Sequence, residues 1–179
     1  MPSAAYPDAL QELMELLRGL PGVGRRSAER MALQLYGWAP DRLSVLAESL
    51  ATLHDRIGVC PECGAMSSGP GQLCGICSSP LRDAAQICVV EDFPQMRSIE
   101  AGGVYKGRYH ILGGTLAPLE GRLACSLSID PLLKRIDAGG VREVILALSP
   151  DVEGQATSIY LANLLKDKPV RISRPAQGL

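Results

Sequence analysis

The stretch Val144–Leu165, which reads VILALSPDVEGQATSIYLANLL, decides the fold class of this 179-residue chain. Its apolar beginning, Val144–Leu148, is typical of a short buried strand, and Gln155–Leu165 has the apolar spacing of a helix. A strand followed directly by a helix is the repeating unit of sheets whose strands run parallel. The stretch therefore predicts an α/β domain.

Earlier segments repeat this alternation of strand and helix. Apolar runs at Ile87–Val90 and Arg108–Leu112 have the length of strands, and Ile129–Ala138 has a helical pattern. Together these segments predict βαβ units on a parallel sheet, within one domain that spans residues 81–179.

Acidic side chains follow two of the predicted strands. Glu91 comes directly after Ile87–Val90, while Asp151 and Glu153 follow Val144–Leu148. Because the carboxyl ends of parallel strands meet at one edge of a sheet, we expect these carboxylates to converge in a crevice there. Acidic clusters of this kind bind magnesium for phosphoryl transfer, although solvated acids are also common at strand ends.

The acidic pattern resembles the Toprim fold of topoisomerases, primases and some nucleases. Catalytic Toprim proteins have a glutamate after the first strand and an Asp-x-Asp pair after the later one. Glu91 and Asp151 match this pattern, whereas Ser149 and Gln155 stand where acids are expected. Weak magnesium binding and no catalysis are predicted. The alternative is a small magnesium-dependent nuclease that uses Glu91, Asp151 and Glu153.

Two cysteine pairs lie within residues 59–80, which form the middle block of the chain. Their spacing is C-x2-C-x10-C-x2-C, and the four thiols are those of Cys60, Cys63, Cys74 and Cys77. Four thiolates complete a tetrahedral zinc shell with no open position, so the site is predicted to be structural. The alternative is four unrelated core cysteines. Cys88 and Cys125 fall outside the pattern.

Residues 1–58 are predicted to be helical, with a glycine turn that is followed by basic residues. The turn is Leu20–Gly24, which reads LPGVG, and residues 18–30 hold four arginines against one glutamate, a local charge of 4 − 1 = +3. A helix that starts after such a turn offers free backbone N–H groups to a phosphate. The pattern resembles the helix-hairpin-helix of sequence-nonspecific DNA-binding proteins. The alternative is a plain helical hairpin.

Composition excludes several classes of protein. Lys and Arg (18) against Asp and Glu (19) give a net charge of −1, which excludes a globally basic nucleic-acid coat. Aromatic residues make up only 4%, which disfavours the stacking platforms of RRM and OB modules. No signal peptide or membrane span is recognisable, so a cytosolic protein is expected. His54, His110 and Trp38 are predicted to be packing residues.

Taken in order, the three blocks resemble the bacterial RecR family of recombination mediators. The resemblance covers nearly the whole chain, and it rests on LRGLPGVGRRSAERMALQL, CPECG with CGICSS and the following Arg82-Asp83, ICVVED, GRYHILGGTLAPLEG, and GGVREVILALSPDVEGQATSIYLANLL. It implies a helix-hairpin-helix region, a zinc knuckle and a Toprim-like domain.

The resemblance also implies a function. RecR-like proteins are non-enzymatic and act with RecO and RecF in DNA gap repair. They help to load RecA onto single-stranded DNA covered by single-strand-binding protein. The family forms a ring-shaped tetramer in the cytoplasm, associated with the nucleoid. The residues implied to contact DNA are Gly22, Gly24, Arg25, Arg26 and Arg30; those implied to bind RecO are Glu91, Asp151 and Glu153.

The chain departs from the family pattern at two places. Residues 122–128, which read RLACSLS, replace a glycine–proline–acid run. Family members also continue with a strand and a helix beyond the sequence that ends here at Gly178-Leu179, so the last segment is expected to be missing. A third hypothesis, a zinc-ribbon adaptor without DNA contact, would require the arginine turn to be buried against another subunit.

Overall fold

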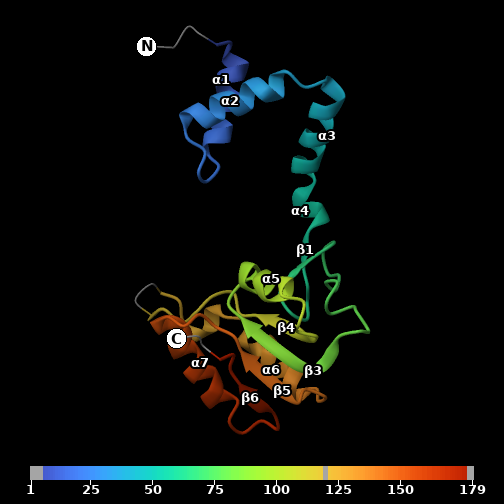
Figure 1. The fold of residues 1–179 in the computed structure, drawn as a ribbon, viewed down its shortest axis with the longest axis vertical. Helices are drawn as coiled ribbons and strands as arrows, with labels where there is room; N and C mark the ends of the chain where they lie inside the picture. The colour runs from blue at the N-terminus through green and yellow to red at the C-terminus, as the bar shows by residue number, and fades with distance from the viewer. Residues whose placement is uncertain (1–5, 119–120, 177–179) are drawn as a thin grey trace. The chain divides into compact units, whose positions relative to one another are not determined.

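The computed structural model describes residues 6–118 and 121–176 of the chain (Figure 1). The chain divides into two compact units, Met1–Leu53 and His54–Leu179. Gly178 and Leu179, where the family sequence is expected to continue, lie outside the described residues.

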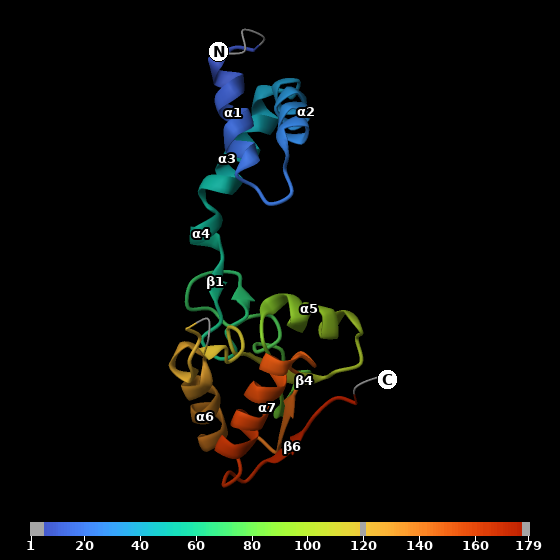
Figure 2. The same cartoon turned by 90° about the vertical axis from the view of Figure 1, so that its left-hand side faces the viewer.

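The first unit is made of helices α1 (Asp8–Arg18), α2 (Arg25–Tyr36) and α3 (Pro40–Ala51). Helices α1 and α2 form a hairpin around the predicted glycine turn (Figure 2). Ala28 and Ala32 of α2 are fully buried. Their small side chains let the neighbouring helix approach α2 closely. The helical character predicted for this region is confirmed.

A short connection leads into the cysteine block. Helix α4 (Leu53–Arg56) is followed by strand β1 (Gly58–Val59), which pairs antiparallel with β2 (Met66–Ser67). Gly58 is required here because a Cβ atom would lie 2.2 Å from the backbone oxygen of Gly69. The two paired strands thus flank the first cysteine pair, Cys60 and Cys63, in the chain.

The second unit is built on a parallel sheet of four strands, in the order β4-β3-β5-β6. The strands are β3 (Asp83–Val90), β4 (Gly107–Ile111), β5 (Glu143–Leu146) and β6 (Arg171–Ser173). All their pairings are parallel. The predicted α/β class with a parallel sheet is therefore confirmed.

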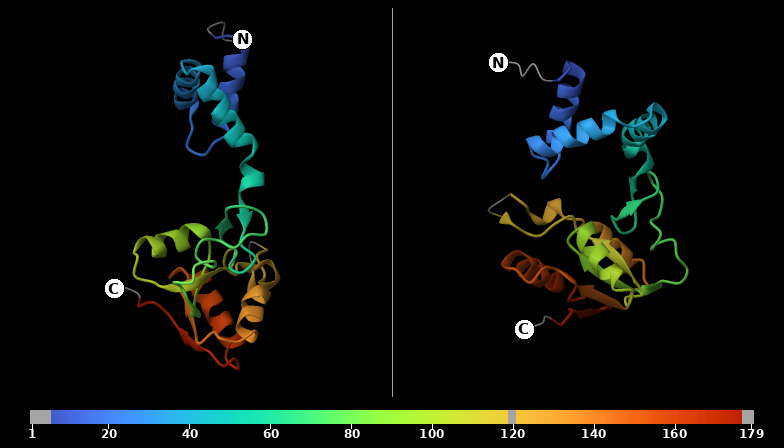
Figure 3. Two further views of the ribbon diagram at one scale, coloured as in Figure 1. Left: turned by 90° about the vertical axis from the view of Figure 1, so that its right-hand side faces the viewer. Right: turned by 45° about the horizontal axis from the view of Figure 1, so that its top comes forward.

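Both faces of this sheet are covered (Figure 2 and Figure 3). On one face, Ile87 and Val89 pack with helices α6 (Ile129–Asp137) and α7 (Val152–Leu164). On the other face, Cys88 and Val90 pack with the four cysteines and with α5. A strand buried on both sides has no polar face, which explains the continuous apolar run in the sequence.

Three elements were not predicted from the sequence: α5 (Phe93–Ala101), β6 and the one-turn η2 (Ala124–Ser126). Helix α5 does carry local start signals. Asp92 caps it by accepting a hydrogen bond from the backbone N of Gln95 at 2.8 Å, and a proline occupies its first turn. Strand β6 and η2 span three residues each, too few to show a period.

Candidate functional site

Four buried cysteines form the clearest candidate site. The Sγ atoms of Cys60, Cys63, Cys74 and Cys77 all lie within 4.8 Å of one another. Tight turns bring them together: the backbone N of Gly64 donates to the oxygen of Cys60 at 2.9 Å, and Gly64 has a φ of 77°. The backbone N of Ser78 donates to the oxygen of Cys74 in the same way, at 3.0 Å.

The thiols of this cluster differ in their pKa values: that of Cys63 is lowered, whereas those of Cys74 and Cys77 are raised, the latter chiefly by its hydrogen bond to Cys63. The pKa of Cys63 is lowered to about 5, chiefly because the thiol of Cys77 donates a hydrogen bond to it. The backbone N of Ala65 also points at the Cys63 sulfur, 3.5 Å away. The pKa of Cys74 is raised, mainly by burial. Four sulfur donors in a closed, buried arrangement fit a metal ion that prefers soft ligands, and the cluster can hold one.

The cysteine cluster is docked on the parallel sheet. The backbone N of Ile111, at the end of β4, donates to the carbonyl oxygen of Cys63 at 2.8 Å. Arg108 of the same strand pairs with Glu62 at 3.2 Å. Beyond the second cysteine pair, Arg82 forms hydrogen bonds with the side chain of Glu100 and with the backbone oxygen of Tyr105. The metal-binding turns therefore hold one face of the sheet in place.

The glycine turn and the start of α2 form a second candidate site. Gly22 has a φ of 77°, which favours glycine, and Gly24 directly precedes the first turn of α2. That turn contains no acidic residue, so its free backbone N–H groups face no competing carboxylate from within it. Arg25, Arg26 and Arg30 of this helix are all exposed.

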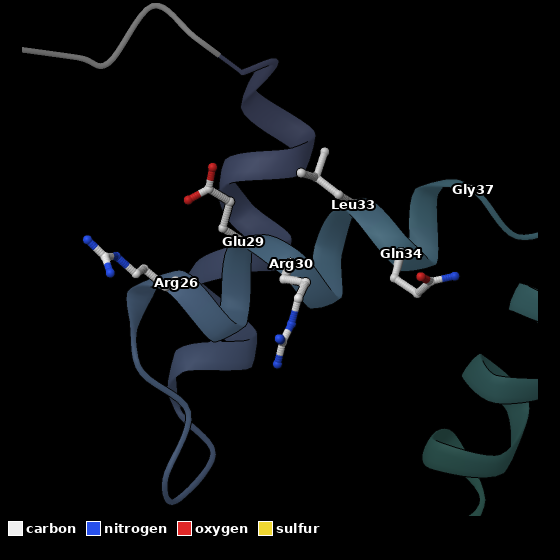
Figure 4. Close-up of a pocket in the computed structure, with 6 residues that line it drawn as sticks. All are labelled: Arg26, Glu29, Arg30, Leu33, Gln34 and Gly37. Carbon is white, nitrogen blue, oxygen red and sulfur yellow. The ribbon is translucent and has the colours of Figure 1, made fainter.

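A shallow groove runs along α2 beside these arginines. It is lined by Arg26, Glu29, Arg30, Leu33, Gln34 and Gly37 (Figure 4). Within the described part of the chain, Arg25, Arg26 and Arg30 make no ion pair, whereas Arg18 pairs with Glu15 at 2.7 Å. Glu29 accepts a hydrogen bond from the hydroxyl of Tyr6 at 2.7 Å. The groove thus presents two unpaired guanidinium groups against one carboxylate.

The carboxyl ends of the parallel strands form a third candidate site. Glu91 lies directly after β3, and its Oε1 accepts a hydrogen bond from the backbone N of Ser149, which follows β5. Asp151 is exposed and caps α7, because its Oδ1 accepts from the backbone N of Gly154 at 2.7 Å. Gly154 leaves no room for a side chain, since a Cβ atom would lie 2.2 Å from the Ser149 oxygen.

Glu153 is already engaged by a cation of the same chain. Its Oε2 pairs with Nη2 of Arg122 at 3.0 Å and accepts a hydrogen bond from Thr115 at 2.9 Å. Among the described residues, only the four cysteines bring three or more candidate ligand atoms together. Glu91, Asp151 and Glu153 are therefore at one edge of the sheet without forming a compact metal cluster.

The two histidines differ from each other. His110 is buried, and burial lowers its pKa to about 4, so it is neutral near pH 7. Its Nε2 lies 2.6 Å from the backbone oxygen of Ser128, in agreement with the predicted packing role. The same prediction for His54 is wrong: α4 is only four residues long and leaves His54 exposed.

The chain combines a helix-hairpin-helix, a four-cysteine cluster and a parallel Toprim-like sheet. This combination defines the class of protein to which it belongs. Comparison with protein families agrees: residues 85–176 match the family described as Toprim domain, and residues 10–54 match RecR, helix-hairpin-helix. No helix among the described residues is long and apolar enough to cross a membrane.

Curated relatives name the family. The chain is 43% identical to "Recombination protein RecR" of Syntrophobacter fumaroxidans over 179 residues, which cover 100% of this chain and 88% of the relative. It is 46% identical to the protein of that name from Hyphomonas neptunium over 98% of this chain and 86% of the relative. For Thermus thermophilus the identity is 42%, over 97% and 87%. The chain belongs to the RecR family.

Arg122 and Thr115 are neighbours of Glu153 that were not predicted from the sequence. Arg122 is 31 positions away from Glu153 along the chain, so no local spacing connects them. A signal was nevertheless present, because Arg122 opens the segment that departs from the family pattern. An unexpected cation near an acidic crevice is a candidate counter-ion.

Proposed function

We propose that this chain is a non-catalytic, DNA-binding recombination protein of gap repair, which acts with RecO and RecF to help load RecA onto single-stranded DNA. The observation that carries the proposal is the groove beside the glycine turn, where Arg26 and Arg30 have no ion-pair partner among the described residues. Membership of the RecR family supports the recombination role. The protein would act in the cytoplasm, at the nucleoid.

Each block has a proposed part in this function. Residues 1–58 would contact DNA through Arg25, Arg26, Arg30 and the backbone at Gly22 and Gly24. Residues 59–80 would hold zinc, since four cysteine ligands complete a tetrahedral shell and leave no open position for catalysis. Residues 81–179 would bind partner proteins. A ring of four subunits is the proposed assembly, and light scattering with and without DNA would test it.

The acidic crevice is the proposed partner surface. Glu91, Asp151 and Glu153 repel phosphate unless a cation neutralises them, and a basic protein surface supplies such a cation. Arg122 already neutralises Glu153 in part, so Asp151 is the carboxylate most open to a partner. RecO is the proposed owner of the basic surface.

The triple variant Glu91→Gln, Asp151→Asn, Glu153→Gln should weaken RecO binding about tenfold and leave DNA binding unchanged. The amides keep the hydrogen bonds to Ser149 N, Gly154 N and Arg122, so the fold should survive while the charge is lost. Titration of immobilised RecO would measure the loss, which should shrink as salt rises because exposed charges are screened.

A control for the loss of a carboxylate elsewhere is Asp167→Asn, which removes an exposed carboxylate at the opposite end of α7 from Asp151. This control should bind RecO as the wild type does. Unchanged RecO affinity in the triple variant would show that the crevice is not the partner surface.

A further inference from the structure

Trp38 is the only tryptophan of the chain, and the structure leaves it partly exposed. It follows Gly37 at the end of α2, and the guanidinium of Arg42 lies 3.6 Å from the centre of its ring. A cation over an aromatic face is attracted to the ring, so the contact with Arg42 favours one orientation of Trp38.

Trp38 lines an apolar hollow that adjoins the basic groove. The hollow has a volume of about 380 Å³ and is lined by Leu17, Arg30, Met31, Gln34, Leu35 and Trp38. Arg30 and Gln34 also line the basic groove, so the two depressions share one wall. In Figure 4 the side chains of Arg30 and Gln34 point to the same side of α2.

We propose that this hollow receives an unpaired base of single-stranded DNA while Arg26 and Arg30 hold the adjoining phosphates. This inference rests on the proposed function and adds to it a preference for single-stranded over double-stranded DNA. Aromatic and aliphatic side chains provide a stacking surface for any base, and the amide of Gln34 can donate to or accept from a base edge. Bases of an intact duplex are stacked inside the helix and cannot enter.

Charge favours DNA over a second copy of this chain as the occupant. Arg30 is at the rim of the hollow and Arg26 lies one turn away along α2, so both would attract a polyanion. A second copy seated on the hollow would cover Arg30, which lines it and has no ion-pair partner among the described residues, and burying an unpaired charge is costly.

The sole tryptophan makes the proposal directly measurable. Emission of the full chain should be quenched by a mixed-sequence single strand. It should stay unchanged on an abasic strand of equal length and on the duplex, both of which should still bind through phosphates. Binding itself is followed by anisotropy of labelled DNA. Trp38→Ala should weaken single-strand binding about tenfold, in line with the loss of one stacked base. Duplex affinity should not change.

Two further variants serve as controls. Trp38→Phe should recover most of the single-strand affinity, and Tyr36→Ala, which removes a neighbouring aromatic ring that is 80% exposed and does not line the hollow, should have no effect. Equal losses on single strand and duplex, or equal quenching by the abasic strand, would overturn the inference while the proposed DNA binding stands. Quenching by protein concentration alone would assign the hollow to a second copy and overturn it as well. Failure of every labelled DNA to bind would reject the proposed function together with the inference.

Discussion

Replacing Cys63 by serine is expected to unfold the cysteine block and to destabilise the unit His54–Leu179. The cysteines are part of the buried cluster that covers one face of the sheet, together with Val90, Tyr109 and Ile111. Structural zinc contributes about 10–16 kcal/mol of apparent binding free energy in small zinc domains, which is as large as the whole stability of many proteins, about 5–15 kcal/mol. Loss of one ligand should therefore destabilise the parallel sheet as well as the cysteine block.

Thermal unfolding followed by circular dichroism, together with the zinc content of the purified chain, measures this effect. Wild type should hold one zinc per chain, and Cys63→Ser should lose both the metal and the cooperative transition. Cys125→Ser is the control, because Cys125 is exposed and outside the cluster. A wild-type chain that keeps its structure and its transition after exhaustive chelation would refute a structural metal.

The double variant Arg26→Ala, Arg30→Ala is expected to lose most of the DNA affinity at low salt. Each phosphate contact that is lost lowers the slope of log K against log salt by about 0.9 on duplex DNA, so the slope should fall by about two. Phosphates carry no base information, so unrelated sequences should be affected equally. Anisotropy of labelled DNA over a series of salt concentrations measures both quantities.

Arg142→Ala with Arg171→Ala is the matched control for charge. These side chains are 80% and 79% exposed, and each has a carboxylate only at the long distance of 3.9 Å. Removing them lowers the net charge by the same amount, yet the salt slope should remain that of wild type. A loss confined to one DNA sequence in the Arg26, Arg30 variant would mean that bases are read at this groove.

Features encoded by local spacing were predictable from the sequence. The two C-x2-C pairs place their own thiols on tight turns, and the apolar runs at β3 and β5 need no distant information to be recognised as buried strands. The position of Glu91 beside Ser149 was also within reach, because adjacent parallel strands end at the same edge.

Features that depend on distant contacts were not predictable. The hydrogen bond from Ile111 to Cys63, which docks the knuckle on the sheet, joins residues 48 positions apart (111 − 63). The pairing of Arg122 with Glu153 likewise has no local pattern. His54 was wrongly predicted to be a packing residue because a helical side chain is buried only where its helix is long enough to pack, and α4 is a single short turn that leaves His54 exposed.

The most direct test of the central claim is to incubate the zinc-loaded chain with labelled single-stranded and duplex DNA in magnesium and to follow binding and cleavage on the same samples. We predict that the DNA is bound and stays intact, and that Glu91→Gln gives the same result. The reason is that Ser149 and Gln155 stand where catalytic Toprim proteins have acids, and that Glu153 is paired with Arg122. Magnesium-dependent cleavage that disappears in Glu91→Gln would contradict the account and identify the chain as a Toprim-type nuclease.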